Sequence, residues 1–219
     1  MRVACLVPST SKKRTWTTPA CSSLNSLVKS IRATTTLDVT IFAGVDHDDP
    51  YYLQHGSDLE TIARIIPVRV DPGHVTHIWN ILAKRAYDEG YDYLIQCGDD
   101  VVFETAGWLE ECIAALGKSG NVGVAGPTDR NNRRILTQTV VHRTHIDIFG
   151  FYFPPEIPNW FCDDWINEVY DKVHRLPPEY TCVNSGGAVR YVVIHCRDLC
   201  TRLVQRDKKR LNICLPLHQ

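Results

Sequence analysis

Two adjacent carboxylates follow a run of apolar residues near the middle of the chain. Residues 93–103 read YLIQCGDDVVF, so Asp99 and Asp100 follow Gly98 at the end of a strand-like stretch, after which the sequence becomes apolar again. Neighbouring carboxylates repel each other and lose hydration on burial, so their presence at a strand end must be offset by something. A bound divalent cation, which prefers oxygen ligands, would offset it. The alternative is a solvated turn that caps the strand.

Polar residues also follow two other strand-like segments. Pro8, Ser9 and Thr10 end the first β-rich run, and Asp46 lies in an acidic turn after the second. In open α/β sheets, ligands bind outside the carboxyl ends of the strands, so these residues are candidates for contacting one ligand together with the acidic pair. For Asp46, ordinary turn chemistry is an equal alternative, because aspartate is common in turns that precede proline.

The elements that must position these residues alternate between strands and helices. Strands are indicated by short β-rich runs, and helices by apolar residues spaced three and four apart. We expect strands at residues 3–7, 39–43, 65–70, 93–97, 122–125 and 188–194, and helices at residues 22–31, 76–89 and 108–116. This order predicts an α/β fold with a mostly parallel central sheet flanked by helices.

Length and composition favour a single domain whose positive and negative charges nearly balance. The chain has 219 residues, of which 44% are hydrophobic, enough to bury one substantial core. Lys and Arg number 24 against 25 Asp and Glu, so overall charge does not favour nucleic acid or an anionic membrane as a partner. No segment approaches the roughly 18 apolar residues of a membrane helix, and no transmembrane segment is expected.

Cysteine usage and missing glycine motifs narrow the function classes further. The nine cysteines lack paired CxxC spacing, so we interpret them as reduced thiols of a cytoplasmic protein. Neither GxGxxG nor GxxxxGK[ST] occurs, which argues against the usual dinucleotide and phosphate-loop sites. An acidic metal site is then the candidate for holding phosphates.

The order of these features resembles that of nucleotide-sugar glycosyltransferases of the GT-A fold. The shared features are a first strand ending in a small polar turn, an acidic turn after the second strand, a helix, and an apolar strand that ends in an acidic cluster. Enzymes of that family bind the donor's metal and ribose with a DxD motif. Gly98 replaces the first carboxylate here, so the resemblance implies Asp100 as the direct ligand of Mn²⁺ or Mg²⁺, with Asp99 assisting or acting through water.

The resemblance also implies how the chain divides its tasks. Residues 1–125 of the single domain would bind the nucleotide-sugar donor, and residues 126–219 would form the acceptor side. His195 would add to the metal shell as the C-terminal histidine of such enzymes, although a lone histidine after a strand is commonly structural. The chain is also similar to the glycosyltransferase domain of a large chlorella-virus protein involved in capsid glycan synthesis, which would place it in the host cytoplasm.

An acidic and aromatic segment lies where GT-A enzymes have their acceptor side. Asp163 and Asp164 stand in the place of the family's acidic pair, which implies a general base, with Asp164 named first because the base is usually the second residue. Helix N-capping is the alternative for either aspartate. Four nearby aromatic residues would form a platform for a sugar or belong to the core: Phe151, Tyr152, Trp160 and Trp165.

A short basic run precedes the first expected helix. Lys12, Lys13 and Arg14 could approach a donor diphosphate, but such a run is typical of a solvated surface, and we favour that interpretation.

Together these features predict a metal-dependent glycosyltransferase. It would move a sugar from a nucleoside-diphosphate sugar, with UDP as the commonest donor type, to a hydroxyl of a glycan or glycoprotein. A catalytically silent nucleotide- or carbohydrate-binding module is the alternative, as is a nucleotidyltransferase, although the glycine-rich loop of the latter is missing. A Gly-Asp-Asp turn also occurs in viral RNA polymerases, but this chain is too short and lacks their basic groove.

Overall fold

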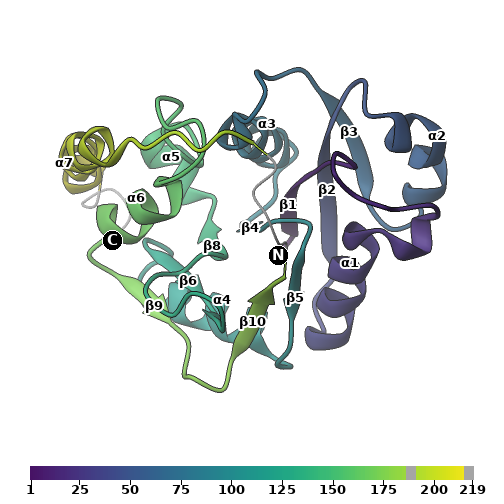
Figure 1. The fold of residues 1–219 in the computed structure, drawn as a ribbon. Helices are drawn as coiled ribbons and strands as arrows, with labels where there is room; N and C mark the ends of the chain where they lie inside the picture. Colours follow the sequence, from purple (N-terminus) through teal and green to yellow (C-terminus); the bar gives the residue numbers. More distant parts are fainter. Residues whose placement is uncertain (186–190, 215–219) are drawn as a thin grey trace.

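A seven-stranded sheet in the order β3-β2-β1-β4-β8-β6-β9 forms the centre of the molecule, and helices cover it (Figure 1). This computed structural model describes residues 1–185 and 191–214. In the sheet, β8 runs antiparallel to both of its neighbours, whereas the other pairs are parallel, so the predicted mostly parallel sheet is confirmed. Its strands are β1 (Val3–Ser9), β2 (Val39–Asp46), β3 (Arg64–Val68), β4 (Tyr93–Gln96), β6 (Val124–Gly126), β8 (Thr139–His142) and β9 (Val173–Arg175).

Helices cover both faces of this sheet, and a small second sheet lies at one end. The helices are α1 (Ser23–Thr34), α2 (Pro50–Leu59), α3 (Val75–Asp88), α4 (Trp108–Lys118), α5 (Thr144–Phe149), α6 (Cys162–Val169) and α7 (Arg197–Cys214), with a 3-10 turn η1 (Pro19–Cys21). The small sheet has the order β5-β10-β7 and consists of β5 (Val101–Phe103), β10 (Thr181–Asn184) and β7 (Thr128–Asp129).

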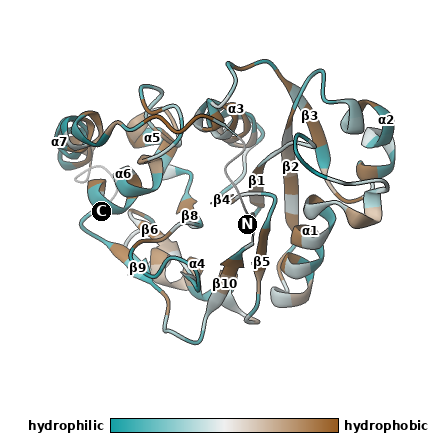
Figure 2. Cartoon of the chain, viewed as in Figure 1, coloured by the Kyte–Doolittle hydropathy of each residue, from teal (hydrophilic) through white to brown (hydrophobic). Residues whose placement is uncertain are grey.

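The strands are buried on both faces, and their alternating side chains supply two hydrophobic cores. From β1, Ala4 and Leu6 pack in the core that α3, α5, α6 and α7 cover, whereas Cys5 and Val7 pack in the core under α1, α2 and α4. Figure 2 shows the hydrophobic residues concentrated in strands such as β1, β2 and β5. This double-sided burial explains why the strand segments read as apolar runs.

The strand order reverses beside β1, and this reversal determines where a ligand can bind. The chain moves outward from β1 through β2 to β3, and α3 then returns it to β4 on the other side of β1. β1 and β4 are parallel neighbours, with Leu6 opposite Gln96, so the residues that follow both strands emerge at the same edge. Such a switch point opens a crevice outside the carboxyl ends of the strands.

The structure also contains elements that the sequence patterns did not predict. The acidic turn at residues 46–50 leads into α2, because Asp49 caps that helix by accepting bonds from the backbone N–H groups of Tyr51 and Tyr52. β8 lies inside the main sheet, although no strand had been expected between residues 125 and 188. Of the strand expected at residues 188–194, positions 188–190 lie outside the described residues, and 191–194 are irregular rather than β.

Within the described residues, every helix is too short or too polar to cross a bilayer.

Close packing of β2 against α3 gives a prediction about stability. A Cβ at Gly44 would lie 2.4 Å from Cγ2 of Ile78 and 3.2 Å from Cδ1 of Leu82, so Gly44→Ala should lower the free energy of unfolding by about 1–3 kcal/mol. Gly56 in α2 has open space around it, so Gly56→Ala should instead raise stability by about 0.5–1 kcal/mol. Urea denaturation followed by circular dichroism measures both, and a destabilised Gly56→Ala would contradict this account.

Candidate active site

The polar residues after β1 and β4 contact each other directly. Ser9 Oγ donates to Oδ2 of Asp99 at 2.6 Å and lies 2.6 Å from the hydroxyl of Tyr52. Burial raises the pKa of Tyr52, so that hydroxyl stays protonated and donates to Ser9. Asp99 is only 1% exposed, and Ser9 is its hydrogen-bond partner from β1. The predicted meeting of these two strand ends is therefore present.

Arg14 contacts both members of the acidic pair. Its Nη2 lies 3.2 Å from Oδ1 of Asp99 and 3.3 Å from Oδ2 of Asp100. The Arg14 side chain is 15% exposed, so the expected solvated surface is wrong for this residue, whereas Lys13 is exposed. The guanidinium is attracted into this position because it supplies positive charge to two adjacent carboxylates.

The loop after β1 is tied to the start of α2. Asp49 is 1% exposed and accepts from the backbone N–H of Ser11 at 2.7 Å, from Ser11 Oγ at 2.6 Å and from Thr10 Oγ1 at 3.2 Å. The same carboxylate caps α2. Thr10 therefore orders the loop through its side chain, and the position of this loop depends on a helix 39 residues further along the chain.

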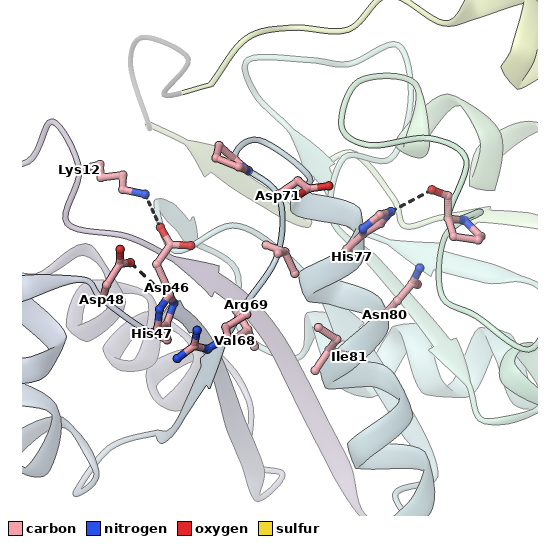
Figure 3. Close-up of a pocket in the computed structure, with 13 residues that line it drawn as sticks. Lys12, Asp46, His47, Asp48, Val68, Arg69, Asp71, His77, Asn80 and Ile81 are labelled. Atoms are coloured by element: carbon pink, nitrogen blue, oxygen red, sulfur yellow. Dashed lines mark hydrogen bonds and ion pairs between the residues drawn. The ribbon is translucent and has the colours of Figure 1, made fainter.

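A pocket of about 730 Å³, here called the outer pocket, lies over the ends of β2 and β3 (Figure 3). Lys12 and Asp46 line it and form an ion pair of 2.7 Å, and the hydrogen bond to Asp46 raises the pKa of Lys12. Arg69 and Asn80 are further polar lining residues. Asp46 is thus the last residue of β2 and faces a pocket, rather than only shaping a turn.

A second hollow of about 620 Å³, here called the central cavity, opens beside the ends of β1 and β4. Asp100 lines this cavity, whereas the Asp99 side chain is buried behind it. A Cβ at position 98 would lie 2.7 Å from Oδ1 of Asp100, so a side chain at this position would collide with the carboxylate and glycine avoids the collision. Further lining residues are Pro8, Arg134, Asn159, Trp160, Asp163 and Asp164.

The acidic pair of α6 faces the central cavity, and its two members differ in their partners. Asp164 is 6% exposed and binds Nη1 of Arg134 at 2.8 Å and Nη1 of Arg197 at 3.4 Å. Burial, followed by repulsion from Asp164, raises the pKa of Asp163 to about 6. The N-cap of α6 is Phe161, so the proposed capping role is wrong for both aspartates. They lie instead in the first helical turn, where the helix dipole favours negative charge.

The aromatic residues of this region divide between the core and the cavity. Tyr152 and Trp165 are fully buried, and Phe151 packs against Trp165 with 5.8 Å between ring centroids. Trp160 is 43% exposed and lines the central cavity. Of the four aromatic residues considered as a sugar platform, Trp160 is therefore the one whose position fits.

The described residues offer Asp100 as an oxygen ligand for a divalent cation, but no complete protein cage. Across residues 1–185 and 191–214, no three His, Cys, Asp or Glu side chains come together as a metal site. His195 is exposed, and the centroid of its ring lies 5.6 Å from the ring centroid of Trp160. The Asp100 carboxylate, which lines the central cavity, fits an ion that shares its coordination with a bound ligand and water, as Mg²⁺ commonly does.

Comparisons with known proteins identify the fold. No protein-family model and no curated sequence matches this chain. Residues 1–349 of S. aureus TarS in complex with UDP-GlcNAc superpose with a TM-score of 0.66 and 12% identity, covering 94% of this chain and 66% of that one. GalNAc-T7 with UDP, GalNAc and Mn²⁺ gives a TM-score of 0.65 and 12% identity, covering 94% of this chain and 48% of that one.

A mannosyltransferase, PcManGT from Pyrobaculum calidifontis in complex with GDP-Man and Mn²⁺, gives a TM-score of 0.56 with 13% identity, over 85% of this chain and 58% of that one. This chain thus spans about two-thirds or less of the length of each of these proteins. At such low identities the likeness concerns the fold, and the predicted GT-A-like α/β domain is confirmed.

The raised pKa of Asp163 predicts a pH-dependent effect on stability. The folded protein binds the proton of the Asp163 carboxyl group more tightly than the unfolded chain does, because an aspartate in the unfolded chain has a pKa of about 3.9. Ionised Asp163 therefore destabilises the fold, with the cost absent below about pH 4 and complete above about pH 7. Asp163→Asn should raise the Tm at pH 8 and leave it nearly unchanged at pH 4, as measured by calorimetry. Asp38→Asn, at an exposed site, is the control, and an equal Tm change at both pH values would contradict the assignment.

Proposed function

We propose that this chain is a glycosyltransferase that moves a sugar from a nucleoside-diphosphate sugar, of the UDP type, to a hydroxyl of a glycan or glycoprotein. The observation that carries this proposal is that Asp100, a ligand candidate for a divalent cation, and Asp163, a base candidate, line the same cavity at the strand switch point. TarS and GalNAc-T7, which share the fold, have been solved with UDP-GlcNAc and with UDP.

The two hollows suit the two ends of such a donor. The outer pocket offers Asp46 and Lys12 as hydrogen-bonding partners for a nucleoside. The central cavity, beside the ends of β1 and β4, offers Asp100 for the diphosphate. Pro8 lines the central cavity directly. Ser9 and Thr10 act indirectly, because their hydroxyls hold Asp99 and Asp49. In this proposal the first-strand turn orders the donor site more than it contacts the donor.

A divalent cation at Asp100 would neutralise the charge that develops on the departing diphosphate. Ser9 and Arg14 hold the carboxylate of Asp99 in place, and the fixed Asp99 in turn supports the position of the adjacent Asp100. His195 would join this group only after a movement, because it packs beside Trp160 and does not line the cavity with Asp100. In this proposal residues 1–125 bind the donor, and residues after 125 supply most of the lining of the central cavity.

On the acceptor side we assign the base to Asp163 rather than to Asp164. A general base works best when its pKa lies near the working pH, and a pKa of about 6 meets that condition. The Asp164 carboxylate is engaged in ion pairs with Arg134 and Arg197, which leaves it less free to contact an acceptor hydroxyl. Trp160, at the same cavity, would lie against the apolar face of an acceptor sugar.

All nine cysteines are free, and Sγ of Cys5 lies 3.5 Å from Sγ of Cys97 without a bond. Unpaired thiols in this number fit a reducing compartment, so we propose the cytoplasm as the site of action.

The function is tested by donor binding to the wild type and to Asp100→Asn. Thermal shift with UDP-glucose, UDP-GlcNAc, UDP-galactose and GDP-mannose should give a stabilised complex for one UDP-sugar with Mn²⁺ and a much smaller shift with chelator, because a ligand of the native state raises its stability. Asp100→Asn keeps the side-chain size and removes the charge, so the metal-enhanced shift should disappear.

Asp38→Asn serves as the matched control and should bind the donor as the wild type does. Equal binding by the wild type in chelator and in Mn²⁺ would refute the metal dependence. Failure of every nucleotide sugar to bind would refute the function itself.

The base assignment is tested by transfer kinetics. Asp163→Asn should lower kcat by roughly a hundredfold or more while donor affinity stays constant. Asp164→Asn should keep more activity and move the acidic limb of the kcat/KM profile below pH 6, because burial still raises the pKa of Asp163 but the additional repulsion from Asp164 is removed. If Asp164→Asn is the inactive variant and Asp163→Asn is not, the base is Asp164, as the sequence pattern had indicated.

A further inference from the structure

The acidic pair already has a cationic group bound to it in the free protein. Arg14 reaches from the loop after β1 and places Nη2 3.2 Å from Asp99 and 3.3 Å from Asp100. Its guanidinium also lies 5.2 Å from the ring centroid of Trp16. The Arg14 Nε is buried and has no hydrogen-bond partner among the described residues. Arg14 thus occupies a position next to the ligand candidate without satisfying all of its own donors.

We propose that Arg14 and a divalent cation compete for Asp100, and that the incoming cation moves the Arg14 guanidinium from the carboxylates onto the donor's diphosphate. The second half of this proposal rests on the proposed function, since it needs a diphosphate at this site. The first half concerns the cation and the two carboxylates alone, and it can be measured without a nucleotide.

Competition follows from the distances and charges at Asp100. A divalent cation binds a carboxylate oxygen at about 2.0–2.6 Å, which brings it close to any group that shares that carboxylate. The guanidinium lies 3.3 Å from Oδ2 of Asp100 and carries positive charge, so it would face strong repulsion from the ion. Asp100 can therefore gain the ion only if Arg14 withdraws.

Arg14 can leave this position while Asp99 keeps a hydrogen-bond partner. Ser9 Oγ still donates to Oδ2 of Asp99 when the guanidinium is gone, so this buried carboxylate keeps a partner. The buried Nε of Arg14, which is unbonded in the present position, can gain a partner elsewhere. The movement therefore costs less than separating a fully satisfied buried ion pair.

The loop geometry permits a side-chain movement around a fixed backbone point. Asp49 holds the backbone of Ser11, and the N–H of Arg14 donates to the carbonyl of Ser11 at 3.0 Å, which closes a tight turn. The base of Arg14 is thus anchored while its long side chain can rotate. Phosphate is a suitable destination, because a guanidinium can donate two parallel hydrogen bonds to phosphate oxygens.

Mn²⁺ alone is the probe for the first half of the proposal. Titration of free Mn²⁺ by electron paramagnetic resonance should show that Arg14→Gln binds the ion about tenfold more tightly than the wild type, because the competitor is gone. Arg14→Lys keeps the charge but lacks the forked donors, and it should bind Mn²⁺ with intermediate affinity. Lys13→Gln removes one positive charge from the neighbouring exposed position and should leave the Mn²⁺ affinity unchanged.

UDP binding measured by calorimetry at saturating Mn²⁺ tests the second half. Arg14→Gln should bind UDP about tenfold more weakly than the wild type, although it binds Mn²⁺ more tightly, and this opposite pair of effects is specific to the exchange. Circular dichroism verifies folding, and Arg14→Lys supplies the same comparison if Arg14→Gln does not fold.

Equal Mn²⁺ affinity in the wild type and both Arg14 variants would overturn the competition, as would the absence of Mn²⁺ binding in all of them. An equal gain in Lys13→Gln would reduce the effect to general electrostatics and overturn it too. Wild type that binds Mn²⁺ but no UDP or UDP-sugar would leave the competition standing and refute the proposed function, so the two failures are distinguishable.

Discussion

The feature on which the site depends is the placement of two adjacent carboxylates at the end of β4, next to β1. Their mutual repulsion is offset by groups that come from three other segments: Ser9 at the end of β1, Tyr52 in α2 behind it, and Arg14 in the intervening loop. On the far side, Ser185 donates to the backbone carbonyl of Asp100 at 3.1 Å through its N–H. The acidic turn therefore joins the main sheet, α2 and the chain after β10, so that its geometry depends on the whole switch point.

Much of the fold could be predicted because the strands of a sheet buried on both faces are apolar, and polar turns punctuate them. The patterns located α1, α3 and α4 within a few residues, together with the first four strands and β6. They missed β8, since four residues, Thr139–His142, in a polar neighbourhood give little periodicity. They also missed α2, although Asp49 and Pro50 form an ordinary cap and first-turn pair, because three aspartates before a proline are equally typical of an isolated turn.

The candidate site was predictable where it follows from strand ends and not where it depends on distant partners. Asp46 ends β2 and Asp100 follows β4, the two strands on either side of β1, so their common edge could be inferred from chain order. Arg14 meets Asp100 across 86 residues and Arg134 meets Asp164 across 30, and no local pattern encodes such pairings. A basic run before a helix normally points to solvent, and Arg14 differs because an acidic pair at the neighbouring strand end attracts it.

The same dependence on distant partners separates two residues that are chemically identical and adjacent in sequence. Arg134 and Arg197 form ion pairs with Asp164, whereas burial, followed by repulsion from Asp164, raises the pKa of Asp163 to about 6. The two carboxylates therefore differ in their surroundings: Asp164 is engaged by two guanidinium groups, whereas the pKa of Asp163 is raised by burial and then by the charge of its neighbour. The arginines that distinguish the two aspartates lie 30 and 33 residues away from Asp164 in the sequence, so the difference between these neighbouring residues of α6 depends on distant segments of the chain.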